Sequence, residues 1–197
     1  MITRTGHFNL FPIYDFAANN VLMPSSLNKQ VQSDYSKLIN KTIEEVPVLP
    51  GWYLWGKFND MGWWETVYLG KAGKKKTSSL RTRLYDELRE ECIAFWAEIY
   101  GREPMIKQDH SRPNAHKYGP PTRALRKVGS RFVIWVAIDD EISEQEIKKQ
   151  EDLLIKIYRP THNAARWNQS AKHDKTTDAI EFAIETELRS IIKPLSS

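Results

Sequence analysis

The sequence predicts an α+β domain in which an aromatic hairpin and a later buried strand form a sheet covered by helices. Residues 51–58 and 65–71 are rich in aromatic and β-branched residues and flank an Asn-Asp-Met-Gly turn at 59–62. These features predict an antiparallel hairpin. Residues 131–138 form an almost continuous apolar, β-prone run, which is typical of a buried central strand. Stretches with apolar residues at helical spacing precede, separate and follow these strands.

Composition limits the class of protein. A chain of 197 residues with 41% hydrophobic and 27% charged residues can bury one core, so we expect one domain with appendages. The net charge of +4 is compatible with a polyanionic partner. The single Cys92 cannot form an internal disulfide, and no Cys/His set has structural-zinc spacing. With no apolar run near the ~20 residues of a membrane span and no secretion signal in residues 1–20, we expect a cytoplasmic protein without a membrane partner.

The first 50 residues predict an arm and a helix. Glycine, proline and asparagine interrupt the apolar residues of 1–24, which predicts an irregular arm. Residues 27–43 then repeat apolar residues at the spacing of one helical face, and Pro47 and Pro50 end this helix before the hairpin. We expect the helix to pack on the core or to pair two subunits.

A lysine-rich loop follows the hairpin and leads into a helix. Lys71, Lys74, Lys75 and Lys76 precede Ser and Thr residues that can cap a helix from about 79 to 99. Free N–H groups at a helix start, together with lysines, favour a phosphate-binding site. Such a run of charges is also typical of solvated surface. Arg83 lies beside the apolar stripe of this helix, whose members are Leu80, Leu84, Leu88, Cys92 and Phe95.

Residues 101–130 predict a long basic insertion. Such a proline-broken loop is uncommon in a compact domain unless it is functional or disordered. We interpret it as a nucleic-acid contact, with a solvated insertion as the alternative. Its candidate contact residues are Arg112, His116, Lys117, Arg123, Arg126 and Lys127.

The helix after the late strand carries an inward-facing acid. Ser143 and Glu146 form a capping box that opens the helix. Glu151 falls on the same face as Ile147 and Leu154, and a buried acid is costly unless it is paired or binds a cation. Glu151 is therefore a candidate metal ligand, and a rim residue bonded to an arginine is the alternative. A last helix is predicted from about 177 to Pro194.

Several short motifs together resemble the GIY-YIG nuclease family. They occur in order over residues 51–163, leaving outside the resemblance the N-terminal arm and helix (1–50), the insertion (101–130) and the C-terminal extension and helix (164–197). The resemblance implies a central three-stranded antiparallel sheet flanked by helices. The motifs are Gly51-Trp52-Tyr53 with Tyr68-Leu69-Gly70, Leu80-Arg81-Thr82-Arg83-Leu84, and the glutamate-helix-proline-asparagine ending over 151–163.

One position departs from the family pattern. The family usually has histidine or tyrosine one helical turn after the arginine that matches Arg83, and this chain has Glu87. Tyr85 is nearby but points away from Glu87 on a regular helix, so either residue is a candidate for the role.

The resemblance implies a divalent-metal deoxyribonuclease that leaves 5′-phosphate and 3′-hydroxyl ends. Glu151 would hold Mg²⁺ or Mn²⁺, and Arg83 would clamp the phosphate. Tyr53 would act as general base or orient the attacking water, with Lys71 or the metal lowering the pKa of its phenol. The implied catalytic set is Tyr53, Tyr68, Lys71, Arg83, Glu151 and Asn163, with Glu87 or Tyr85.

The late strand and glutamate helix look most like the type II restriction endonuclease branch. One site cuts one strand, so double-strand cleavage of DNA predicts a homodimer, at least during cutting. A phage or mobile-element nuclease and a non-catalytic DNA-binding module of the same fold remain the alternatives. The predicted DNA contacts outside the insertion are Lys74, Lys75, Lys76 and Arg81.

Overall fold

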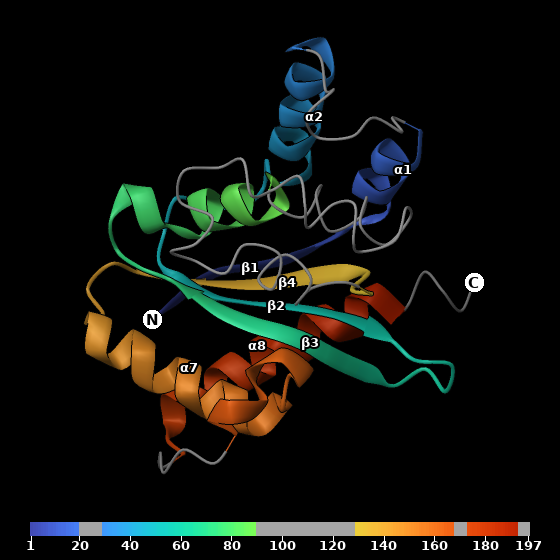
Figure 1. The fold of residues 1–197 in the computed structure, drawn as a ribbon. Helices are drawn as coiled ribbons and strands as arrows, with labels where there is room; N and C mark the ends of the chain where they lie inside the picture. The colour runs from blue at the N-terminus through green and yellow to red at the C-terminus, as the bar shows by residue number, and fades with distance from the viewer. Residues whose placement is uncertain (20–28, 90–128, 168–172, 193–197) are drawn as a thin grey trace.

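A computed structural model describes residues 1–19, 29–89, 129–167 and 173–192. Within this part of the chain, an antiparallel sheet with strand order β1-β4-β2-β3 lies between two layers of helices (Figure 1). The strands are β1 (Ile2–Asn9), β2 (Gly51–Phe58), β3 (Trp64–Ala72) and β4 (Phe132–Ile138). The α+β class is confirmed, and the described sheet has four strands where the resemblance implied three.

The predicted hairpin and central strand are confirmed. β2 pairs with β3 on one side and with β4 on the other. The turn is closed by the Asn59 side chain, whose Oδ1 accepts from the backbone N–H groups of Met61 at 3.1 Å and Trp63 at 3.0 Å. β3 forms one edge of the described sheet, and this places the second tyrosine motif at the border of the sheet.

The predicted irregular arm is wrong for residues 1–19. This segment forms β1, which pairs with β4, and then α1 (Phe11–Asn19). Gly6 suggested a break, but it lies opposite Trp135 in the strand register. A Cβ on Gly6 would lie 2.4 Å from the Trp135 ring, so the glycine makes room for an indole instead of ending a strand.

Each face of the sheet has its own core, which explains why the central strands are apolar on both faces. α1, α2 (Lys29–Thr42) and helix 80–89 cover one face, and α7 (Glu144–Tyr158) and α8 (Lys175–Ile192) cover the other (Figure 1). The first core includes Leu10, Ile39, Tyr53, Trp55, Leu84, Leu88 and Trp135, and the second includes Trp52, Leu54, Leu69, Ile134, Ile147, Leu154 and Ile184.

Local capping sets where the helices of the second layer begin and end. Ser143 caps α7 by accepting from the N–H of Glu146 at 3.1 Å, as the capping box predicts. α7 ends at Tyr158, and the next residue, Arg159, caps it in the left-handed conformation with φ of 43°, immediately before Pro160. Asp174 caps α8 by accepting from the N–H of Thr177 at 3.0 Å. Two short 3-10 turns, η2 (Lys76–Ser78) and η4 (Thr161–Arg166), border β3 and α7.

Two predicted features lie wholly or largely outside the described residues. They are the end of the helix beyond residue 89, with Cys92 and Phe95, and the basic insertion up to residue 128. Among the helices that the structure describes, none has the length and apolar character needed to cross a membrane.

Candidate active site at the β3 edge

A pocket of about 430 Å³ at the β3 edge gathers residues from distant parts of the sequence. Five of the predicted catalytic residues line it, together with Gly73, Ser78 and Glu144. Tyr68 packs against the core beneath helix 80–89, whereas Glu144 and Glu151 come from α7 on the opposite face. The pocket lies at the edge strand, so side chains from both faces reach it. The five predicted residues are Tyr53, Tyr68, Lys71, Arg83 and Glu151.

The two motif tyrosines lie side by side in this pocket. Their ring centroids are 6.3 Å apart, and Tyr53 is fully buried. Gly70 is the register partner of Tyr53, and a Cβ there would lie 2.5 Å from the Tyr53 hydroxyl oxygen. The glycine of the second motif is therefore required by the ring of the first motif's tyrosine.

Tyr53, Glu87 and Arg83 meet through one carboxylate oxygen. The Tyr53 hydroxyl donates to Glu87 Oε1 at 2.6 Å, and Arg83 Nη2 donates to the same oxygen at 3.3 Å. Glu87 is only 5% exposed. Tyr85 instead packs partly buried against the first core. Of the two residues considered for the position after Arg83, Glu87 is thus the one that contacts the tyrosine of the site.

The environment of Tyr53 keeps its phenol protonated. Burial raises the pKa of Tyr53 well above 10, the charges of Glu87 and Tyr68 raise it further, and Arg83 opposes them. Lys71 instead pairs with Glu144, with Nζ and Oε2 3.8 Å apart. The expectation that Lys71 lowers the pKa of Tyr53 is therefore wrong for the protein groups described, because desolvation of the phenolate dominates.

Glu151 faces the pocket with an arginine as its partner. Its side chain is nearly buried, and Arg166 donates to both carboxylate oxygens at 3.2 and 3.0 Å. Arg166 also bonds Asp152. The alternative of an arginine-bonded acid therefore describes Glu151 here. Sequence reasoning missed Arg166, and the only available signal was its place in the polar stretch just after Asn163.

Asn163 acts on the backbone of the edge strand. Its Oδ1 accepts from the N–H of Leu69 at 3.0 Å, and its Nδ2 donates to the carbonyl of Leu69 at 3.2 Å. The side chain thus takes the place of a neighbouring strand beside β3. This arrangement fits the bracing role that the resemblance implies, and it holds the strand that carries Tyr68.

The described basic residues near the pocket divide into two groups. The loop beside the pocket exposes Lys74, Lys75 and Lys76. Their contacts with DNA stay a prediction. Arg81 donates to the backbone carbonyls of Val46 at 2.6 Å and Glu44 at 2.7 Å. The structure thus gives Arg81 an anchoring contact, which ties the segment before β2 to helix 80–89.

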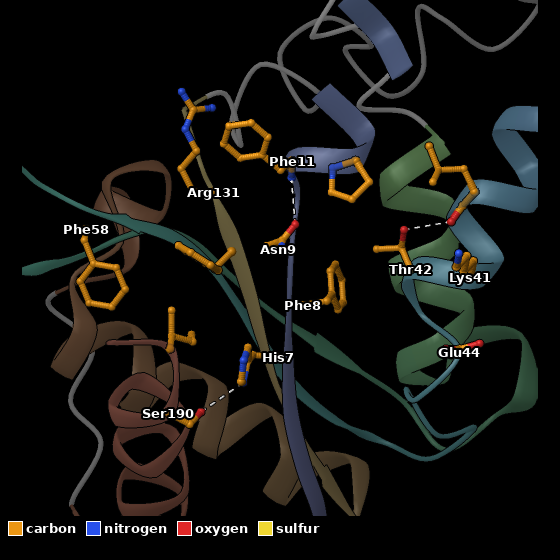
Figure 2. A pocket seen from close by; sticks show the side chains of 14 residues that line it. His7, Phe8, Asn9, Phe11, Lys41, Thr42, Glu44, Phe58, Arg131 and Ser190 are labelled. Carbon is orange, nitrogen blue, oxygen red and sulfur yellow. Dashed lines mark hydrogen bonds between the residues drawn. The ribbon is translucent and has the colours of Figure 1, made fainter. Parts of the chain in front are cut away.

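A larger cavity of about 930 Å³ lies away from these residues, between α1, α2, α8 and the ends of the strands (Figure 2). Some of its polar side chains bond other atoms of its lining, whereas His7 also pairs with Glu187 outside the lining at 2.7 Å. Ser190 lies 3.4 Å from His7 Nδ1, Asn9 accepts from the N–H of Phe11 at 3.2 Å, and Thr42 donates to a carbonyl of its own helix at 2.9 Å. It lacks the clustered phenols and buried carboxylate of the β3-edge pocket, so size alone does not make it the better candidate.

Among the residues that the structure describes, one group of possible metal ligands away from this pocket lies at the start of α8. His173 Nε2 is 2.8 Å from Asp178 and 3.2 Å from Glu181. These are ordinary distances between an imidazole nitrogen and carboxylate oxygens, and the group is largely exposed. It is separate from the residues that line the β3-edge pocket.

A comparison with protein-family models, one with curated proteins and one with solved structures found no match to this chain.

Proposed function

We propose that this chain is a metal-dependent endonuclease that hydrolyses double-stranded DNA to 5′-phosphate and 3′-hydroxyl ends. The observation that carries the proposal is the β3-edge pocket. Residues from the separate motifs face one space there, although the sequence distance between Tyr53 and Glu151 is nearly a hundred residues. Phosphodiester hydrolysis needs an activated water, neutralisation of phosphate charge and a fixed orientation of both.

The chain's own residues match these needs. Arg83 has a partly exposed guanidinium at the pocket, and its planar fork suits the non-bridging oxygens of a phosphate. Lys71 adds a second positive charge from β3. Tyr53 and Tyr68 offer hydroxyl groups that can orient a water or a phosphate oxygen. Asn163 keeps β3 in register with the rest of the site.

The donor groups at the pocket fit a hard divalent cation. Glu151 would hold Mg²⁺ or Mn²⁺, since Arg166 uses one lone pair on each carboxylate oxygen and leaves another on each. Such ions accept one or two carboxylates and keep several waters. When bound, the ion would neutralise phosphate charge and lower the pKa of a coordinated water.

The surroundings of the pocket support DNA as the substrate. Lys74, Lys75 and Lys76 are exposed beside it, and the whole chain carries a net charge of +4. We further propose the restriction-endonuclease role with a homodimer for double-strand cutting, with a phage or mobile-element nuclease as the alternative. The second candidate function is a non-catalytic DNA-binding module. Two observations support it: Glu87 stands where the family has histidine or tyrosine, and Arg166 occupies the Glu151 carboxylate.

Plasmid cleavage with and without Mg²⁺ tests the proposal. Wild type should cut supercoiled plasmid only with the ion, and Glu151→Gln should lose cleavage while keeping DNA affinity. Glu141→Gln, an exposed Glu-to-Gln change after β4, is the matched control and should cut normally. Discrete fragments support a site-specific enzyme, and a smear supports nonspecific cutting.

Two results would contradict the proposal in different ways. Mg²⁺-dependent cleavage by Glu151→Gln at the wild-type rate removes Glu151 from the mechanism. DNA binding by wild type without any cleavage identifies the non-catalytic module instead.

A further inference from the structure

We propose that Glu87 accepts the hydroxyl proton of Tyr53 during water attack, so that the two residues act as a proton relay. This inference rests on the proposed nuclease function and deepens it. It gives a catalytic task to the position at which the chain departs from the family pattern.

The geometry of the pair supports a relay. The 2.6 Å separation between the Tyr53 hydroxyl and Glu87 Oε1 is typical of a hydroxyl bonded to a carboxylate. Both side chains are buried, so bulk water does not compete for this bond. Arg83 donates to the same oxygen from one helical turn away and fixes its position.

The orientation of Tyr53 suits it to accept a second proton. A hydroxyl that donates its proton still has two lone pairs on oxygen. The Tyr53 hydroxyl directs its proton at Glu87. Tyr53 also lines the pocket in which the attacking water would lie. Tyr53 can therefore take a proton from water while it passes its own to the carboxylate.

Every proton in the reaction is accounted for with water as the only reactant besides DNA. The attacking water gives one proton to the Tyr53 oxygen, and the Tyr53 proton moves to Glu87, which becomes a carboxylic acid. The water oxygen forms the new bond to phosphorus, and the bond from phosphorus to the 3′ oxygen breaks. A solvent water protonates the leaving oxygen, and Glu87 returns its proton to solvent after the products depart.

Glu87 explains how a protonated Tyr53 accepts a proton from the attacking water. A buried phenol whose pKa lies well above 10 is almost entirely protonated near neutral pH, so it cannot act as a base that is already ionised. An adjacent carboxylate lets the phenol exchange one proton for another without becoming a free phenolate. The carboxylate charge, which opposes ionisation of Tyr53 in the resting site, attracts the transferred proton.

Single-turnover cleavage by Tyr53→Phe, Glu87→Gln and the double variant tests the relay. Glutamine keeps the size of Glu87 and can accept the tyrosine hydrogen bond, but it cannot take a proton at neutral pH. Each single variant should slow cleavage by about 10²–10⁴-fold. The double variant should be no slower than the worse single variant, because the two residues act as one unit. DNA affinity should stay within about twofold of wild type.

A control and a second readout separate a relay from simple packing. Asp86→Asn removes an exposed carboxylate from the same helix and should cut at the wild-type rate. By proton NMR, wild type should show a downfield hydroxyl resonance that is absent in Tyr53→Phe and shifted in Glu87→Gln. A missing resonance would overturn the contact on which the relay depends.

The possible failures are distinguishable. If wild type cuts DNA and Glu87→Gln cuts equally fast, the relay is wrong and the nuclease proposal stands. If wild type cuts no DNA with Mg²⁺, the nuclease proposal fails and the relay fails with it, even where the resonance is present.

Discussion

Replacing Asn163 with alanine should lower the free energy of unfolding by about 2–4 kcal/mol. The substitution removes two hydrogen bonds at 3.0 and 3.2 Å and leaves the buried N–H and carbonyl of Leu69 without that partner. Each buried polar group that loses its partner costs about 1–3 kcal/mol. We take the lower part of the summed range, because β3 is an edge strand and water can reach part of the gap.

Urea denaturation followed by tryptophan fluorescence measures this loss. With a slope of about 2 kcal/mol/M, the midpoint should fall by about 1–2 M. Asn40→Ala is the matched control, because the Asn40 side chain is exposed on α2 and bonds only a carbonyl of its own helix among the described contacts. It should change stability by less than about 0.5 kcal/mol. Equal midpoint shifts for the two variants would refute the view that Asn163 secures the edge strand.

Three further changes test other contacts. Arg166→Ala should lower the free energy of unfolding by about 1–3 kcal/mol, because the Glu151 carboxylate loses both hydrogen bonds from the guanidinium group. Arg166→Lys should recover only part of that loss in the same urea assay. Gly70→Ala should cost about 1–3 kcal/mol and slow cleavage, because the new Cβ displaces the Tyr53 ring; normal stability and cleavage would contradict this packing. Asp174→Ala should cost about 1 kcal/mol as a lost helix cap, whereas Asp174→Asn should cost less. Hydrogen bonds from Lys149 and from the backbone N–H of Thr177 lower the pKa of Asp174. The melting temperature of wild type should therefore exceed that of Asp174→Ala by its full amount above about pH 4. This difference should shrink as the pH falls toward the pKa of Asp174 in the folded protein.

Local pattern was enough to predict most of the described elements. Runs rich in aromatic and β-branched residues around a turn predicted β2 and β3, and a continuous apolar run predicted β4. Helical spacing predicted α2, α7 and α8. The same spacing placed Glu151 on the inward face of α7, where the structure has it. These predictions succeed because periodicity and capping depend on residues within a few positions of one another.

Local sequence was enough to predict that two tyrosine-bearing strands form a hairpin and that a buried acid follows on a later helix. What those residues contact depends on how the whole chain packs. β1 joins the sheet because Gly6 accommodates the Trp135 ring, a fit that no local pattern around Gly6 reveals. Glu87 reaches Tyr53 across 34 residues of sequence, and Asn163 reaches the β3 backbone across 94. Such partners are set by how the layers pack against the sheet, and the energy of a buried polar group depends on that packing and not on its neighbours in sequence.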